Sequence, residues 1–186
     1  MKQSIEHYDL SYRLLHWSMA FLILLMLFAF IGFNPDLTQA ERLEMLVGHS
    51  TIGTIISILL LLRITKRFIK RDPQPDNGLT GWQKVVAGVV HGGLYLMMIV
   101  VPMTGYLTAN LHKLPVMVFA NFNASSVSDA NQFSPEAFAF MRELHHSAIL
   151  TLLVLIGLHI GAALYHRLIK KDHVLSVMMR RNKANR

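Results

Sequence analysis

Four histidines interrupt the long apolar stretches of this sequence: His16, His49, His145 and His159. A histidine within a membrane-length apolar segment is costly unless it is paired or ligated, so each of them is a candidate functional residue. Imidazole is the side chain that most often binds metal ions in proteins. The chain has no cysteine, which excludes disulfides, thiolate metal sites and cysteine nucleophiles. The sequence therefore predicts that imidazoles bind a metal centre in an apolar environment.

The spacing of two of these histidines limits the kind of centre that they can hold. His145 and His159 are 14 residues apart, which is two heptads, so both lie on one inward face of a helix in a left-handed bundle. They are ~21 Å apart along the helix axis, too far for both to bind one small metal ion. A four-histidine zinc site is therefore excluded by distance. His146 is a poorer candidate, since it lies about 140° around the helix from His159.

Four apolar segments are long enough to carry these histidines across a bilayer, because about 20 residues span a thickness of about 30 Å. We expect spans at 14–33, 46–62, 85–109 and 145–168. The 186 residues are 53% hydrophobic and only 16% charged, with a mean hydropathy of +0.39. This composition is typical of an all-α integral membrane four-helix bundle, which would occupy 1–186 as a single membrane domain. We interpret the first segment as a retained span because it lacks the small-residue cleavage site of a signal peptide.

Two helix starts are marked by capping residues. Thr38 and Glu41 have the spacing of a capping box, so the second helix is expected to begin outside the membrane. Ser134 followed by Pro135 is typical of an N-cap and a first helical residue. We therefore expect the fourth helix to begin there and to continue without a break into the bilayer.

Basic residues gather on one side of the expected spans. Of the 18 Lys and Arg residues, all but Arg42, Lys113 and Arg142 flank the same ends of the spans. By the positive-inside rule we expect both termini to be cytoplasmic. The net charge of +7 would also suit a nucleic-acid partner, but the charges flank apolar segments. Contact with membrane lipid is the better interpretation, and we expect no nucleic-acid partner.

Depth in the membrane pairs the four histidines. Counted from Phe33, His16 lies ~25 Å below the outer edge of the membrane and His49 lies ~4 Å below it. The difference of ~21 Å equals the separation of His145 and His159. We therefore expect an outer site from His49 and His145 and an inner site from His16 and His159, each with room for a porphyrin between two imidazoles. Ligation by two histidines fills both axial positions, which favours electron transfer over oxygen binding.

Glycines and an arginine near these histidines each have two interpretations. Glycines flank His49 and His159 in the sequence: Gly48, Gly53, Gly157 and Gly161. They could let a porphyrin approach the backbone, or they could serve helix packing. Arg63 is 14 residues after His49 and shares its face at the inner level. Its guanidinium could bind haem propionates, or it could anchor the helix at the membrane interface.

The other histidines are weaker candidates. His91 begins the third span on the cytoplasmic side, and Tyr95 follows one turn later. Both could line a quinone pocket or bond a propionate, with a structural role for His91 as the alternative. His166 is seven residues after His159 and also faces inward, so it is an alternative inner ligand. The remaining ones look solvent-facing: His7, His112 and His173.

The ordered set of motifs resembles the bacterial cytochrome b561 family, the small b-type membrane cytochromes, over nearly the whole chain. The matching residues are Arg13, His16, Trp17, Gly48, His49, Arg63, His91, Tyr95, Pro102, Gly105, His145, Gly157, Leu158, His159, Lys171, Asp172 and Leu175. The resemblance implies a four-helix bundle in the bacterial inner membrane with two haem b groups and ubiquinone as co-substrate. It also implies four iron ligands: His16, His49, His145 and His159.

Some members of that family are superoxide oxidases, which pass electrons from superoxide outside the membrane to ubiquinone. We expect electron transfer between an outer one-electron donor and ubiquinone, with His91 next to the quinone. The three cations of the outer segments face six carboxylates: Asp36, Glu41, Glu44, Asp129, Glu136 and Glu143. This excess of negative charge argues against bulk attraction of superoxide, although Lys113 and Arg142 could form a local basic funnel.

Two other classes of membrane protein are alternatives. A membrane anchor and electron conduit for a separate dehydrogenase would also bind haem, but hydrogenase-type cytochromes of that kind carry an extra span. A small channel or transporter would bind no haem and would leave four depth-matched histidines unexplained. The expected spans also contain no acidic residue for ion coupling.

Overall fold

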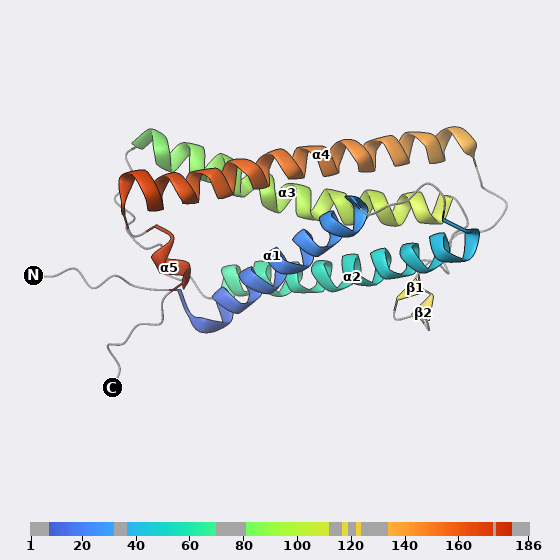
Figure 1. Ribbon diagram of the computed structural model, residues 1–186, viewed down its shortest axis with the longest axis horizontal. Helices are drawn as coiled ribbons and strands as arrows, with labels where there is room; N and C mark the ends of the chain where they lie inside the picture. Colours follow the sequence, from blue (N-terminus) through green and yellow to red (C-terminus); the bar gives the residue numbers. More distant parts are fainter. Residues whose placement is uncertain are drawn as a thin grey trace, which may run out of the picture.

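The computed structural model describes residues 8–31, 37–69, 81–111, 117–118, 122–123, 134–172 and 174–179. Within them the chain forms four long α-helices, as the sequence predicts: α1 (Leu10–Ile31), α2 (Gln39–Ile69), α3 (Gly81–Leu111) and α4 (Pro135–Tyr165) (Figure 1). Two short antiparallel strands, β1 (Met117–Val118) and β2 (Phe122–Asn123), lie between α3 and α4 in the sequence. A π-helical turn, η1 (His166–Lys170), follows α4, and the short α5 (Ser176–Met179) comes after it.

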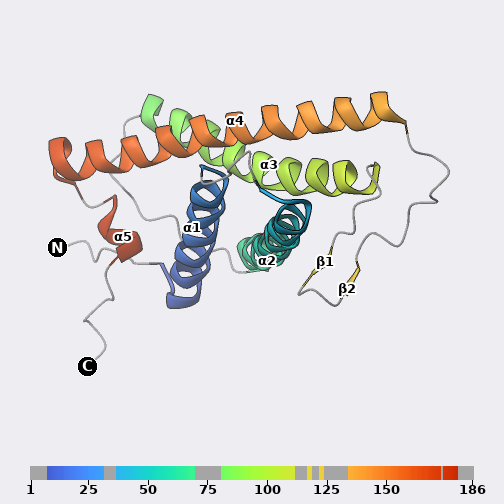
Figure 2. The same cartoon turned by 45° about the vertical axis from the view of Figure 1, so that its right-hand side comes forward.

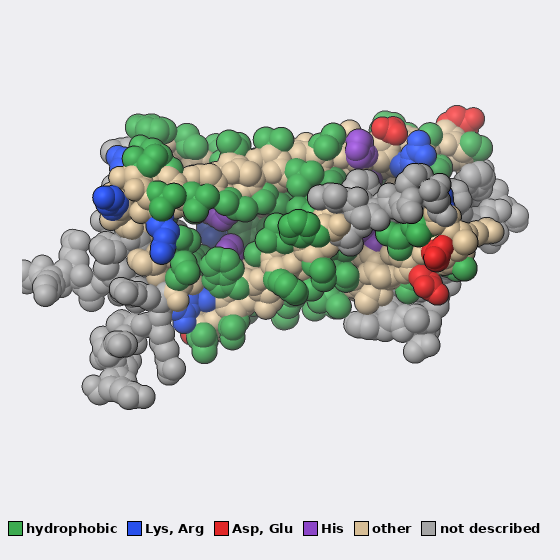
Figure 3. Space-filling model, viewed as in Figure 1, with side chains coloured by type: hydrophobic (Ala, Val, Ile, Leu, Met, Phe, Trp, Pro, Cys, Tyr) green, Lys and Arg blue, Asp and Glu red, His purple; other side chains and the backbone are tan. Residues whose placement is uncertain are grey.

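All four long helices are long and apolar enough to cross a membrane. Their outward surfaces are apolar: the side chains of Phe21, Phe28 and Val154 are 65%, 69% and 64% exposed. Figure 3 shows apolar side chains along the length of the molecule. Exposure of such surface to water costs about 25 cal/mol per Å², whereas lipid chains are as apolar as the side chains that they cover. The chain is therefore a multi-pass membrane protein.

The second and fourth helices begin at the predicted capping residues. Thr38 N–H donates to Glu41 Oε2 over 2.8 Å, and Glu41 N–H donates to Thr38 Oγ1 over 3.3 Å, which completes the capping box. Ser134 Oγ accepts from Ala137 N–H over 3.3 Å, and Pro135 is the first residue of α4. Both helices therefore begin several residues before the expected spans, because these caps satisfy the first N–H groups outside the apolar segments.

The bundle consists of two helix pairs. The most extensive helix contacts in the described chain join α3 to α4, followed by those of α1 with α2, whereas α2 and α3 touch much less. Figure 2 shows α3 and α4 together on one side of the molecule and α1 and α2 on the other. Within the α3–α4 pair, a Cβ added at Gly93 would lie 3.1 Å from Leu155 Cδ1, so the glycine lets these helices approach closely. The space-filling view shows a hollow between the two pairs, which we call the gap (Figure 3).

The chain reverses direction after α4. Lys171 has a φ of 53°, in the left-handed region, and its N–H donates to His166 O. The segment that follows packs against α1: Trp17 Nε1–H donates to Met178 O over 3.3 Å, and Val177 is only 3% exposed. The start of α1 and the short α5 therefore lie at the same end of the bundle (Figure 1).

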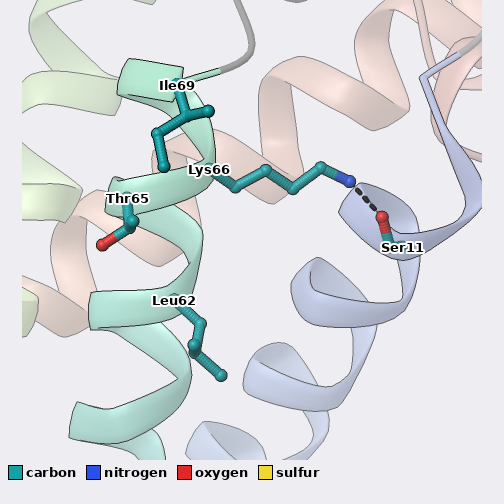
Figure 4. Close-up of a pocket in the computed structure, with 5 residues that line it drawn as sticks. All are labelled: Ser11, Leu62, Thr65, Lys66 and Ile69. Carbon is teal, nitrogen blue, oxygen red and sulfur yellow. Dashed lines mark hydrogen bonds between the residues drawn. The ribbon is translucent and has the colours of Figure 1, made fainter.

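A groove of about 390 Å³ opens between α1 and α2 at this end, lined by Ser11, Leu62, Thr65, Lys66 and Ile69 (Figure 4). The Lys66 side chain reaches across it, and its Nζ contacts Ser11 Oγ and, at 2.8 Å, Asp9 Oδ2. The Lys66 ammonium, and after it the Ser11 hydroxyl, hold the pKa of the Asp9 carboxyl below its usual range. The contact ties the start of α1 to the last turns of α2.

Asp9→Asn should lower the stability of the protein at neutral pH by about 0.5 kcal/mol, because it removes a partly exposed ion pair. The difference from the wild type should shrink as the pH falls below about 4, because the unfolded chain then binds a proton that the folded chain does not. Thermal unfolding in detergent, followed by circular dichroism at about pH 7 and about pH 3, measures both effects. Glu44→Gln, which removes a carboxylate near the other end of α2, is the matched control, and equal losses for the two variants would contradict the assignment.

Candidate functional site

Two pairs of histidines face each other between the helix pairs. The ring centroids of His16 on α1 and His159 on α4 are 6.2 Å apart. Those of His49 on α2 and His145 on α4 are also 6.2 Å apart. The structure thus brings together the same partners that the depth argument joins. Figure 3 shows histidine side chains in the hollow between the helices.

The separation of the rings suits an iron ion between them. Iron bound to two opposite imidazoles through bonds of about 2 Å holds the ring centroids about 6 Å apart. The ring planes are inclined by 71° and 82° in the two pairs, which such a site allows because each ring can turn about its metal–nitrogen axis. Among the described residues no three His, Cys, Asp or Glu side chains converge as the ligands of a bare metal ion would. The residues present therefore fit iron inside a planar macrocycle, with one imidazole on each face.

His91 on α3 lies beside the inner pair. Its ring centroid is 5.1 Å from that of His159, and its Nδ1 is 2.7 Å from Ala87 O. Because a carbonyl oxygen only accepts, Nδ1 carries the proton and donates it, and Nε2 keeps its lone pair. His91 and His159 belong to the closely packed α3–α4 pair, and their ring centroids are closer together than the about 6 Å that imidazoles on opposite sides of one iron ion need. The two rings therefore lie on one side of the gap and cannot bind opposite faces of one haem.

A buried cation lies at the inner level. Arg63 on α2 is only 8% exposed, and its Nε–H donates to Tyr95 Oη over 3.0 Å. The guanidinium carbon is 4.7 Å from the centroid of the Tyr12 ring. The guanidinium is thus held inside the bundle by aromatic neighbours rather than extended toward the membrane interface.

Two neighbours of Arg63, Tyr12 and Arg67, were not predicted to be site residues. The guanidinium carbon of Arg67 is 5.9 Å from the Tyr95 ring centroid, and the Tyr12 ring lies against the Arg63 guanidinium. The signal that could have identified these residues is helical spacing. Tyr12 is four residues before His16, and Arg67 is four residues after Arg63, so each lies one turn from a candidate residue on the same face.

One backbone oxygen and one side-chain oxygen of α3 hold the His145 ring at the outer level. His145 Nδ1 is 2.9 Å from Val101 O and 3.0 Å from Thr104 Oγ1. The Thr104 hydroxyl is buried, and it donates its own hydrogen to Val100 O over 2.8 Å. Both neighbours therefore accept from His145 Nδ1–H, and Nε2 keeps the lone pair that a metal ion needs. The role of Thr104 was not predicted, because its contact with His145 joins two different helices.

The structure places His166 elsewhere than opposite His16. Its Nδ1 is 2.5 Å from Asp172 Oδ2, and its ring packs against Tyr165 with centroids 5.7 Å apart. No ring contact in the described part of the chain joins it to another histidine. His146 lies on an exposed face of α4. Four other residues considered above lie outside the described residues: His7, His112, Lys113 and His173.

The glycines beside His49 and His159 border open space. An added Cβ would meet no atom within 4 Å at any of them: Gly48, Gly53, Gly157 and Gly161. Close helix packing in the described chain therefore does not require these glycines. The space beside both histidines is what the approach of a macrocycle would need.

Comparison with known proteins gives a family for this arrangement. A family model of prokaryotic cytochrome b561 matches residues 7–181, which include both imidazole pairs. Cytochrome b561 homolog 2 of Escherichia coli (strain K12) is 28% identical over 138 residues, which cover 74% of this chain and 71% of that protein. Cytochrome b561 homolog 1 of the same organism is 28% identical over 135 residues, which cover 73% of this chain and 74% of that protein. The family implies haem b, which the ring separations fit, and this chain belongs to the prokaryotic cytochrome b561 family.

Proposed function

We propose that this chain is a b-type cytochrome with two haems in the bacterial inner membrane, and that it transfers electrons between an outer one-electron donor and ubiquinone. The observation that carries the proposal is the equal separation of 6.2 Å between the rings of His16 and His159 and between those of His49 and His145. A haem b with an imidazole on each face exchanges single electrons and has no open position for oxygen. Two such sites at two depths provide a path across the apolar layer.

One helix sets the distance between the two sites. α4 supplies His145 to the outer site and His159 to the inner site, while α2 and α1 supply His49 and His16 as the opposite ligands. Because α4 is continuous between its two histidines, the sites stay ~21 Å apart along its axis. These four histidines would hold the porphyrins in the gap between the two helix pairs.

Arg63 holds the propionates of the inner haem. A guanidinium that is buried at membrane depth needs a negative partner, and Tyr95 is a neutral acceptor for only one of its five N–H groups. A carboxylate can accept two of the others in a bidentate arrangement. This function explains why Arg63 is buried, which an anchor at the membrane interface would not be.

His91 delivers protons to the quinone next to the inner site. Its Nδ1–H is fixed to Ala87 O, so Nε2 is the atom that takes up and releases a proton. Figure 3 shows Lys and Arg side chains mainly at one end of the molecule and Asp and Glu side chains mainly at the other. By the positive-inside rule the basic end is cytoplasmic, so both termini would be cytoplasmic and quinone reduction would draw its protons from that side.

Two cations in the described part of the outer end, Arg42 and Arg142, have neighbouring partners. Arg42 Nε–H donates to Leu37 O over 3.1 Å, and Arg142 Nη2 is 3.6 Å from Glu143 Oε1. An assay of ubiquinone reduction driven by superoxide therefore tests whether this anion is the donor. Reduction that superoxide dismutase abolishes would assign superoxide. A dehydrogenase that stays bound during purification would instead favour the function of an electron conduit.

Double alanine variants should show which histidines share a haem. His16→Ala with His159→Ala should leave one haem per chain, because the outer pair is intact. His16→Ala with His145→Ala should lose both haems, because each pair has lost a member. Absorbance of the pyridine haemochrome per mole of protein measures the ratio, and His146→Ala is the control that keeps the full content. Equal haem contents in the two double variants would refute the assigned pairs.

His91→Ala should slow the reduction of ubiquinone at least about 10-fold, because it removes a positioned proton donor. The reduced-minus-oxidised haem spectrum should remain that of the wild type, since His91 is not an iron ligand. Stopped-flow reoxidation of the reduced protein by a soluble ubiquinone analogue measures the rate, with Tyr165→Phe as a control at an exposed position of α4. A loss of haem absorbance in His91→Ala would show that the residue is structural.

A further inference from the structure

The α3 backbone approaches the His145 ring more closely than a side chain would allow. A Cβ added at Gly105 would lie 2.9 Å from Cε1, 3.4 Å from Nδ1 and 3.5 Å from Nε2 of His145. The ring would have to move to admit it. Gly88, on the same helix, shows the contrast, because a Cβ added there would meet no atom within 4 Å. The absence of a side chain at Gly105 therefore determines where the His145 ring can lie.

The same turn of α3 also determines which nitrogen of His145 faces the gap. Val101 O and Thr104 Oγ1 both accept from Nδ1–H, at 2.9 Å and 3.0 Å. Acceptors on the far nitrogen of a metal-bound imidazole fix its orientation and make the other nitrogen more basic. A more basic ligand stabilises oxidised iron relative to reduced iron, which lowers the reduction potential.

The inner pair has the opposite environment. Within the described chain, no hydrogen bond holds the ring of His16 or His159, and the buried Arg63 guanidinium lies at this level, against the Tyr12 ring one turn from His16 on α1. A nearby cation disfavours the additional positive charge of oxidised iron, which raises the reduction potential. The surroundings of the two sites therefore shift their reduction potentials in opposite directions, although the ring separations are equal.

We infer that Thr104 and Gly105 are positioning residues for the outer haem, and that they act through His145 to make it the weaker electron acceptor of the two haems. Electrons that enter at the outer site then pass downhill to the inner site. The inference rests on the proposed function and extends it, since it gives the electron path a direction that comes from the chain itself.

Potentiometric titration of the purified full-length protein tests the role of Thr104. Thr104→Val, which removes the hydroxyl and keeps the shape, should raise the lower of the two midpoint potentials and leave the higher one unchanged. Thr104→Ser, which keeps the hydroxyl, should behave as the wild type. Thr108→Val is the matched control one turn along α3, because among the described residues the Thr108 hydroxyl donates only to Thr104 O, at 2.7 Å. The double variant His16→Ala with His159→Ala keeps only the outer haem. Its single midpoint potential should therefore match the lower of the two wild-type potentials.

Haem content tests the role of Gly105. Gly105→Ala should reduce the haem content to about half of the wild-type value, with the loss confined to the outer haem, whereas Gly88→Ala should keep all of it. If the Gly105→Ala protein keeps two haems and the wild-type spectrum, binding of the outer haem does not require the close approach of α3 to His145.

The outcomes separate this inference from the proposed function. A wild type with two haems, in which Thr104→Val shifts neither potential or in which the outer haem has the higher potential, overturns the inference alone. If Thr104→Val loses the outer haem and Thr104→Ser keeps it, the positioning role stands, whereas loss from both variants overturns it in favour of packing. A wild type with fewer than two haems overturns the proposed function together with the inference.

Discussion

Facing imidazoles connect the two helix pairs at two depths of the bundle. The α1–α2 pair and the α3–α4 pair are each closely packed, and the rings that meet between them keep centroid separations of 6.2 Å. A haem in each site would fill this space, so cofactor binding and the packing of the bundle would stabilise each other. Arg63 lies at the inner level of this gap, and Thr104 and Gly105 lie against the His145 ring at its outer level.

The membrane explains why polar groups at membrane depth have their partners inside the bundle. Lipid offers no hydrogen bonds, so a polar group at membrane depth must find its partner within the bundle. Arg63 has Tyr95 as a partner, and His145 has Thr104. These contacts orient groups that would otherwise turn freely, and they do so at both levels. The same constraint that makes a polar residue expensive in the membrane therefore also makes its position precise enough for chemistry.

Features that depend on neighbouring residues, and the depth of each histidine along its helix, could be predicted from the sequence, whereas the rotation of one helix against another could not. Apolar length gave the four spans, and the local hydrogen-bonding capacity of Thr38 and Ser134 gave two helix starts. The constant rise of a helix was enough to match histidines by depth. The bond from His145 to Thr104 depends on the rotation of two helices, which spacing along one helix does not specify. The reversal at Lys171 lacks the usual glycine, so no residue type announced its left-handed backbone.

The central claim is that the gap holds two haems, each between two histidines. The haem-to-protein ratio of the purified wild-type chain, combined with its reduced-minus-oxidised spectrum, tests that claim most directly. The account predicts two haem b groups per chain, both low-spin because imidazoles fill both axial positions. A colourless protein, a ratio of one, or a high-spin spectrum that shows an open axial position would contradict it.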